Sequence, residues 1–268
     1  MPKEQYFAEQ SPDEFEEQRL RLLESLRDSD TTRRMEEFGV GPGWNCLEVG
    51  AGSGSIALWL AERVGFTGRV VAADINPRFL ERIQLSNLDI RRHDVCEQDF
   101  EPEAYHLVHC RGLLMHLPTP EEVLNRMAKA VRPGGWIFVE EPDFGSFGSV
   151  DPTYPGAADF DRSNRVVFHF AQTSGSMQSY FARRLPGLVK RLGFENFGYT
   201  GTVRVSLGRD DLLARFWSLT ARTPGPRELL IAAGVQTREQ LDHVLNMYDD
   251  DSFEFVEPVT FAAWARRP

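Results

Sequence analysis

The sequence predicts an α/β protein built on a doubly wound sheet. A short apolar strand, Cys46–Val49, runs into three alternating glycines and then into the helical apolar pattern of Ile56–Leu60. Strands and helices keep alternating as far as Glu141, which implies parallel pairing with right-handed crossovers. A hydrophobic content of 41% over 268 residues is enough for a substantial core.

Two helices are expected before the glycine turn, over 12–28 and 31–38, where Pro12-Asp13-Glu14 gives a start signal and Gly39 a stop. The strands of the central region are short, and they are expected at 44–49, 68–73, 88–92, 105–110 and 136–140. The helices between them are expected at 55–64, 78–86 and 120–131. The last of these is stopped by Arg132-Pro133-Gly134-Gly135.

After Glu141 the alternation breaks. Residues 142–176 are rich in Pro, Gly, Ser and aromatic side chains, with a helical patch over 159–171. A short helix over 185–192, a strand over 199–207, a helical stretch over 209–248 and a last apolar strand over 259–264 complete the chain. We find no internal repeat.

Composition excludes several classes of function. A net charge of −10 with scattered Arg pairs argues against a nucleic-acid partner, because phosphate binding needs clustered Lys and Arg. No apolar window of about 18 residues is present, so no membrane span is expected. The N-terminus lacks the apolar core of a secretory signal. Cys46, Cys96 and Cys110 form no CxxC pair, which favours reduced thiols in a cytoplasmic protein over disulfides or a metal site.

The glycine turn predicts a nucleotide-like ligand. Alternating glycines let a ligand approach the backbone and bring the unpaired N–H groups of the next helix to it. Dinucleotide sites favour GxGxxG, whereas Gly50, Gly52 and Gly54 form GxGxG. Glu48 lies two residues before the first glycine, where a carboxylate would repel a pyrophosphate and attract an ammonium or a sulfonium. Spacing and charge together indicate S-adenosyl-L-methionine.

The ordered motifs resemble those of the class I S-adenosylmethionine-dependent methyltransferases of the small-molecule type, over about residues 30–142. The resemblance is carried by Glu48-x-Gly50-x-Gly52-x-Gly54, by Asp74 at the end of the second strand, by His93-Asp94-Val95, by Arg111–Leu117 after the fourth strand, and by the helix and turn that end in Val131-Arg132-Pro133-Gly134-Gly135. It implies that Asp74 holds the ribose hydroxyls and that Asp94 accepts from the adenine amino group. The cofactor-binding residues it implies are Tyr6, Glu48, Gly50, Gly52, Gly54, Asp74, Ile75, Asp94, Val95 and Arg111.

The resemblance also implies a Rossmann-like, mostly parallel, seven-stranded sheet with an antiparallel last strand. We expect a single domain over 1–268, in which 1–40 form a helical lid and 41–142 the cofactor-binding core. Residues 143–183 are expected to be an insertion that covers the substrate, and 184–268 the rest of the sheet with a helical insertion over 209–248.

Several residues have a structural interpretation beside the functional one. The glycines could serve helix–sheet packing alone, Asp74 could cap the turn before Pro77, and Asp94 could be a turn residue. Glu48 could act indirectly, by holding the glycine loop, and Arg111 could contribute only its carbonyl. His116 and His169 are the candidate catalytic bases, although each could be structural.

The expected function is methyl transfer to a small organic molecule of secondary metabolism, by in-line attack and mainly through positioning. The aromatic side chains of 142–181 suggest a closed apolar pocket, although some must be core. Tyr154 and Tyr180 could bond the substrate or only pack. The rival interpretations are a non-methylating protein of this fold, such as a cyclase or a binding protein, and an NAD-dependent oxidoreductase. A homodimer is left open.

Overall fold

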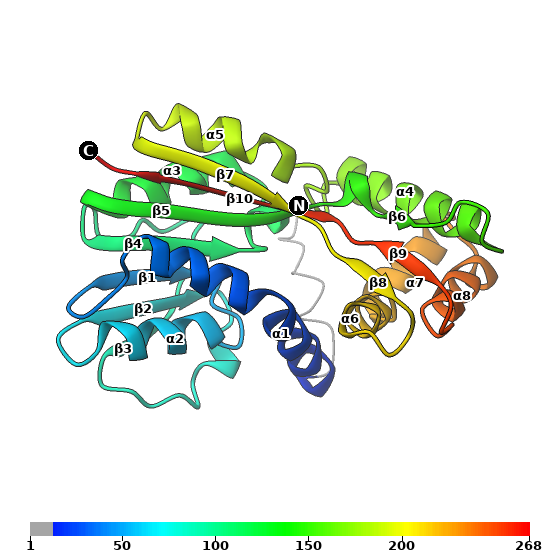
Figure 1. The fold of residues 1–268 in the computed structure, drawn as a ribbon, viewed down its shortest axis with the longest axis horizontal. Coiled ribbons are helices and arrows are strands. Elements are labelled where there is room, and N and C mark those ends of the chain that lie inside the picture. The colour runs from blue at the N-terminus through cyan, green and yellow to red at the C-terminus, as the bar shows by residue number, and fades with distance from the viewer. Residues whose placement is uncertain (1–12) are drawn as a thin grey trace. The chain divides into compact units, whose positions relative to one another are not determined.

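The computed structural model describes residues 13–268 (Figure 1). Its contacts divide the chain into two compact units. The first, called the sheet unit, comprises Arg27–Glu141, Phe181–Gly201 and Phe261–Pro268. Among the described residues, the second, called the helical unit, comprises 13–26, Pro142–Tyr180 and Thr202–Thr260. The single domain over 1–268 stays a prediction, and each unit is described by itself.

The sheet unit is built on a seven-stranded sheet of order β3-β2-β1-β4-β5-β10-β7. Its strands are β1 (Asn45–Val49), β2 (Arg69–Asp74), β3 (Leu88–Arg92), β4 (Tyr105–Arg111), β5 (Val131–Asp143), β7 (Glu195–Thr202) and β10 (Val259–Arg266). β1 pairs in parallel with β2 and β4, and the parallel pairing extends to β3 and β5. Gly134 N donates to Arg267 O and Arg267 N to Gly135 O, so β10 runs antiparallel to β5. The predicted fold class, antiparallel last strand included, is confirmed.

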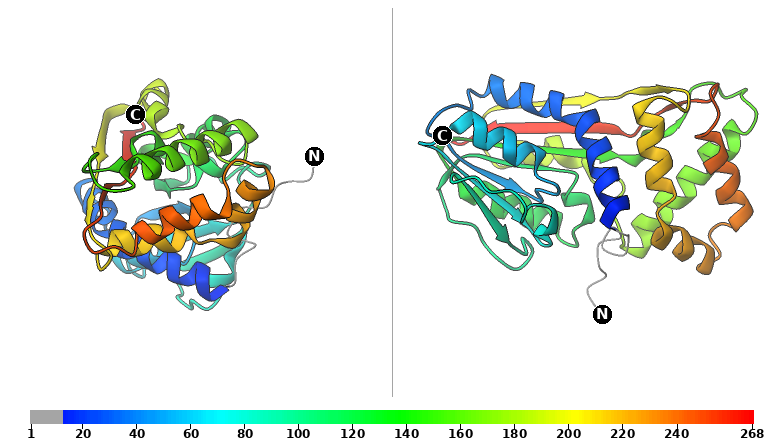
Figure 2. Two further views of the ribbon diagram at one scale, coloured as in Figure 1. Left: turned by 90° about the vertical axis from the view of Figure 1, so that its right-hand side faces the viewer. Right: turned by 90° about the horizontal axis from the view of Figure 1, so that it is seen from below.

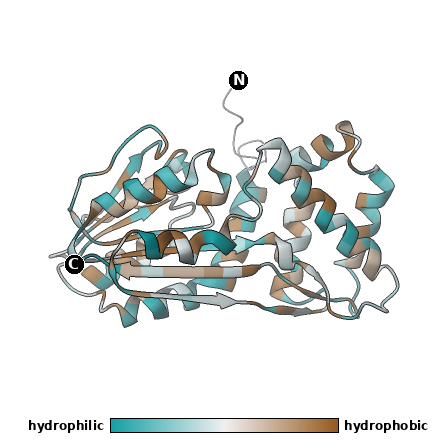
Figure 3. Cartoon of the chain, turned by 90° about the horizontal axis from the view of Figure 1, so that it is seen from above, coloured by the Kyte–Doolittle hydropathy of each residue, from teal (hydrophilic) through white to brown (hydrophobic). Residues whose placement is uncertain are grey.

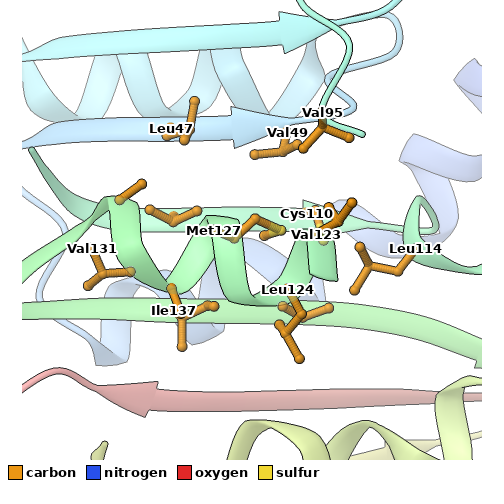
Figure 4. Packing of buried hydrophobic residues seen from close by; sticks show 14 of the residues in the cluster. Leu47, Val49, Val95, Cys110, Leu114, Val123, Leu124, Met127, Val131 and Ile137 are labelled. Atoms are coloured by element: carbon orange, nitrogen blue, oxygen red, sulfur yellow. The ribbon is translucent and has the colours of Figure 1, made fainter. Parts of the chain in front are cut away.

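Both faces of this sheet are buried, as a parallel sheet requires. One face packs on α3 (Pro120–Ala130) and α5 (Leu185–Arg191). Figure 4 shows Val123, Leu124 and Met127 of α3 directed at side chains of the sheet, Cys110 and Ile137 among them. The opposite face packs on α2 (Ser55–Val64) and on the C-terminal half of α1 (Asp13–Glu37). Helices with one buried side carry both hydrophobic and hydrophilic stretches, as the colours of Figure 3 show.

The helical unit has its own small sheet, in which β9 (Glu254–Val256) pairs antiparallel with both β6 (Gly148–Ser149) and β8 (Val205–Leu207). Its helices are α4 (Ala157–Ser174), α6 (Leu212–Ala221), α7 (Pro224–Ala232) and α8 (Arg238–Met247), coloured green to orange in Figure 2. α4 contacts α8, and α6 contacts β8. Phe160 lies at the centre of an aromatic cluster with Phe147, Phe253 and Phe255.

Four expectations about individual elements are corrected. The two N-terminal helices are one helix, α1, and the helix expected over 78–86 is only the short 3₁₀ turn η2 (Pro77–Phe79). The strand expected over 199–207 is two strands, β7 and β8, in different sheets. The stop at 132–135 does end α3, but β5 begins at Val131 and includes the glycines. The other 3₁₀ turns are η3 (Leu114–His116), η4 (Phe144–Ser146) and η5 (Ala182–Arg184). Among residues 13–268, no helix is long and apolar enough to span a membrane.

Candidate functional site

The glycine turn joins β1 to α2 at the carboxyl edge of the sheet. Gly50, Gly52 and Gly54 have φ angles of +72°, +57° and +96°, which side chains with a Cβ disfavour. The N–H groups of Gly50 and Ala51 donate to Ala73 O at 2.8 and 3.2 Å, which holds the turn against the end of β2. α2 then begins at Ser55 with Gly54 as its N-cap. The turn therefore presents a helix N-terminus at an edge where ligands of α/β sheets bind.

Asp74, at the end of β2, is bonded directly to this turn. Its Oδ2 accepts from Gly52 N at 3.0 Å, and its Oδ1 accepts from Asn76 N at 2.9 Å. Its carbonyl accepts from His93 N at 2.8 Å, which ties in the segment after β3. A carboxylate has about four lone-pair sites, so capacity remains for ligand hydroxyls. Ile75, the next residue, is 51% exposed.

Asp94 and Val95 follow β3 in a tight turn. The Oδ1 of Asp94 accepts from Cys96 N at 3.0 Å, and its carbonyl accepts from Glu97 N and Gln98 N. Val95 is buried in the core on the α3 side of the sheet. Asp94 thus has the turn role that the sequence left open.

Glu48 takes part in a buried ionic cluster. Its Oε2 lies 2.6 Å from Nδ1 of His109, and Nε2 of the same ring lies 3.2 Å from Oε2 of Glu140. All three side chains are buried. Burial disfavours the charged imidazole, but the carboxylates of Glu48 and Glu140 outweigh it and raise the pKa of His109 to about 9. Burial raises the pKa of Glu140, and its hydrogen bond and attraction to His109 lower it further than burial raises it.

The cluster extends to α1. Thr31 Oγ1 donates to Glu140 Oε2 at 2.6 Å and accepts from Arg111 at 2.9 Å. The other terminal nitrogen of Arg111 donates to Asp28 at 2.7 Å. The side chain of Arg111 therefore binds α1, while its backbone ends β4 next to Gly112, whose N–H donates to Glu140 O.

Glu141 organises the turn that follows β4. Its Oε1 accepts from the N–H groups of Leu113 and Leu114 at 2.9 and 2.7 Å, and its Oε2 from Met115 N at 3.3 Å. The side chain is fully buried, and burial raises its pKa to about 7 against the lowering effect of these bonds. The turn contains His116, which is half-buried. One carboxyl group thus fixes the backbone segment that the resemblance assigns to the methionine part of the cofactor.

The other candidate residues belong to different parts of the chain. His169 is an exposed residue of α4 in the helical unit, whereas His116 belongs to the sheet unit. Tyr6 lies outside the described residues. Tyr154 is paired with Ser252 at 3.4 Å between their hydroxyl oxygens.

Half of the aromatic side chains of 142–181 are buried in a core. Phe144, Phe147 and Phe160 are buried in the helical unit, and Phe144 stacks on Phe168 at 4.2 Å between ring centroids. Phe181 is part of the core of the sheet unit. The packing of two cores therefore accounts for much of the aromatic density, which weakens this density as evidence for an apolar ligand pocket.

The prediction from sequence did not include three residues of this site: His109, Glu140 and Glu141. A signal was available, because all three are ionisable residues within or directly after apolar strands whose neighbours must be buried. A titratable side chain in such a strand needs a partner, and the register sets Glu48 directly opposite His109.

The two curated relatives described here are both named as methyltransferases. "Methyltransferase str3" of Strobilurus tenacellus is 33% identical over 146 residues, which are 54% of this chain and 50% of that protein. "Ubiquinone biosynthesis O-methyltransferase" of Hydrogenovibrio crunogenus is 33% identical over 99 residues, 34% of this chain and 40% of that protein. The alignments thus span half or less of these relatives' own lengths.

A solved structure of a proposed methyltransferase from Bacillus halodurans has the same fold, with a TM-score of 0.57 at 18% identity, covering 90% of this chain and 99% of that one. The family model described as "Methyltransferase domain" matches residues 7–197. That range contains the glycine turn, Asp74, the ionic cluster and the Glu141 turn. The chain belongs to the methyltransferase-domain family.

Proposed function

We propose that this chain binds S-adenosyl-L-methionine and transfers its methyl group to a small organic molecule, of the kind found in secondary metabolism. The observation that carries the proposal is the bond between Asp74 and Gly52 within a chain of the methyltransferase-domain family. This bond brings the acid assigned to the ribose to the glycine turn assigned to the methionine part. The relative named for ubiquinone biosynthesis supports an organic acceptor.

The proposed cofactor contacts follow the carboxyl edge of the sheet. The glycine turn would take the carboxylate and sulfonium end, with the backbone of Arg111 and the Glu141 turn beside it. Asp74 would accept from the ribose hydroxyls, and the exposed side chain of Ile75 is suited to pack on the adenine ring. Asp94 and Val95 would flank the adenine, and Tyr6 would add a contact from the N-terminus.

The cofactor, when bound, supplies an activated methyl group. The chain's own residues then need to bind and orient the acceptor and to exclude water, which accounts for much of the rate in such reactions. We propose His116 and His169 as the candidate bases for acceptors that must lose a proton. His116 is favoured, because it lies on the turn fixed by Glu141, whereas His169 is exposed on α4.

We further propose that the protein acts in the cytoplasm, with no nucleic-acid or membrane partner. The three free thiols, two of them buried, support a reducing compartment. The net charge of −10 supports a partner other than nucleic acid. Whether the protein forms a homodimer is answered by sedimentation.

Calorimetry with S-adenosylhomocysteine tests the cofactor assignment. We expect Asp74→Ala to weaken binding by about tenfold or more, since hydrogen bonds to a charged acceptor contribute about 1.5–3 kcal/mol each. Asp99→Ala is the matched control, because Asp99 is a largely exposed aspartate paired only with Arg126. Absence of binding by the unchanged protein would refute the proposal.

Methyl transfer is tested separately, with methyl-labelled cofactor and a panel of phenols, amines and activated carbon acids. Label in an organic product confirms the activity. Cofactor binding without label transfer to any acceptor would favour a non-methylating role. Binding of a nicotinamide dinucleotide in place of the cofactor, followed by nicotinamide fluorescence, would favour an oxidoreductase.

A further inference from the structure

The imidazole of His109 is held between two carboxylates in the interior of the sheet unit. Its Nδ1 lies 2.6 Å from Oε2 of Glu48, and its Nε2 lies 3.2 Å from Oε2 of Glu140. The exposed fraction is 0% for His109, 4% for Glu48 and 6% for Glu140. Water therefore does not compensate for a mismatched proton at either contact.

The number of protons on the ring follows from these two contacts. A neutral imidazole donates through one nitrogen only, and the other presents a lone pair. Between two carboxylates, that lone pair would face an anionic oxygen at hydrogen-bond distance. Only the doubly protonated ring donates at both ends and also supplies the charge that two buried carboxylates require.

The groups around the ring agree with this charge. From β4, Arg111 approaches the cluster and bonds Thr31, while from α1 Asp28 accepts from Arg111. On β1, the thiol of Cys46 is kept neutral, because burial and the nearby charge of Glu48 raise its pKa. The remaining contact is apolar, with the ring of Phe138 at 5.0 Å between centroids. With His109 protonated, three carboxylates face two cations.

The cluster connects the start of the glycine turn to α1. Glu48 lies two residues before Gly50, at the start of the glycine turn, and Glu140 carries the bond from Thr31 of α1. Within residues 13–268, the side chain of Glu48 makes one hydrogen bond, in which its Oε2 accepts from His109. Its Oε1 is therefore the acceptor that we assign to a cationic group of the ligand. The position of that acceptor therefore depends on His109.

We propose that His109 is a positioning residue, an imidazolium that holds Glu48 beneath the glycine turn and joins it to α1 through Glu140 and Thr31. This rests on the proposed function, since the ligand it serves is S-adenosyl-L-methionine. Loss of one of the two ring protons leaves a single donor, so the ring no longer joins Glu48 to Glu140, and affinity for the cofactor falls. A merely structural ion pair would stabilise the fold without this effect on affinity.

The protonation state is tested on the unchanged protein, by nitrogen NMR with ¹⁵N-labelled histidine rings and no ligand. We expect both ring nitrogens of His109 to be protonated at about pH 7.5, with deprotonation centred near the pKa of about 9. A single protonated nitrogen at that pH would overturn the proposal. This measurement does not depend on the cofactor, so it remains decisive if the proposed function fails.

The positioning role is tested by a double-mutant cycle on the affinity for S-adenosylhomocysteine at about pH 7. We expect Glu48→Gln and His109→Gln each to weaken binding by about tenfold or more. The double variant should bind no more weakly than whichever single variant binds more weakly. Losses that multiply would overturn the proposal. His106→Gln is the matched control, a histidine of the same strand bonded to Asn45 and Arg132, and it should change affinity by less than about twofold.

A pH series completes the test. The amino group of the ligand also titrates near pH 9, but it does so with both proteins and cancels in the ratio of the two affinities. We expect the dissociation constant of His109→Gln divided by that of the unchanged protein to fall toward one as the pH rises through about 9. A ratio that stays constant would contradict the requirement for an imidazolium.

Discussion

Replacing Glu141 should reveal how much of the stability depends on one buried carboxyl group. Glu141→Met keeps the length and approximate volume of the side chain but removes both oxygens, whereas Glu141→Gln keeps one of them. In the structure, Oε1 accepts from Leu113 N and Leu114 N at 2.9 and 2.7 Å. The amide oxygen of Gln can take both of these bonds, and Met can take neither.

The quantity to compare is the difference in the free energy of unfolding between Glu141→Met and Glu141→Gln. Both remove the cost of burying a carboxylate, so that contribution cancels. Leaving two buried N–H groups without an acceptor costs about 1–3 kcal/mol each, and the third contact, at 3.3 Å to Met115 N, adds little. We therefore expect Glu141→Met to have a free energy of unfolding about 3 kcal/mol below that of Glu141→Gln.

Urea denaturation followed by circular dichroism measures this difference, provided that the two variants unfold with the same denaturant dependence. Hydrogen exchange should in addition show faster exchange of the Leu114 amide in the Met variant. Equal stability of the two variants would refute the reasoning, since it would mean that the backbone of 113–115 needs no acceptor from Glu141.

Three further results are expected. The folded-state pKa of His109, about 9, lies above its ordinary value of 6.5. Its contribution to the free energy of unfolding is therefore complete below about pH 6.5 and is lost as the pH rises through about 9, a fall of about 3 kcal/mol. Urea titrations at several pH values should find this fall in the unchanged protein but not in His109→Gln. Gly54→Ala should destabilise by about 1–2 kcal/mol because φ is +96°, and no loss would argue that the turn relaxes freely. Phe160→Ala should cost about 3–5 kcal/mol in the helical unit, since the ring is 0% exposed; amide exchange that stays slow in α8 would count against this.

The sheet was predictable because its signals are local and repeated. β1, β2 and β4 each contain a short apolar run followed by a turn signal. Burial on both faces of the sheet accounts for the continuous apolar character of such runs. The predicted helix over 55–64 agrees with α2, residue for residue. The antiparallel last strand was predicted from the family resemblance instead. The order of β10 and β7 was not predicted, since no local pattern specifies which strand lies between which.

The elements that differ do so because tertiary contacts override local preference. The interruption expected in α1 at 28–30 is absent, and the two threonines that follow are accommodated in the helix. Thr32 bonds back to the carbonyl of Asp28, and Thr31 donates to Glu140 of the sheet. The stretch over 78–86 has good helix formers but makes successive short turns instead. Asn87 is bonded to the end of α2, at Ala61 O and Gly65 O, which fixes where that connection must finish.

The site was predictable where it consists of backbone and strand-end acids, and less so inside the sheet. Asp74 follows from its place after β2. The argument for Glu48 was a charge directed at the cofactor, and its bond to His109 could not be anticipated without the register of β1 and β4. Which residues face each other across strands depends on the fold as a whole. A single sequence therefore predicts that a buried ionisable side chain has a partner, but not which residue that partner is.

The position of β10 in the sheet determines when the protein can finish folding during synthesis. β10 lies between β5 and β7, yet it is the last strand of the chain. Until it emerges from the ribosome, β5 is an open edge that can pair with other chains, and β7 has no place in the sheet. We therefore expect nascent chains that stop before Val259 to depend on chaperones, although the parallel strands from β1 to β5 are already complete.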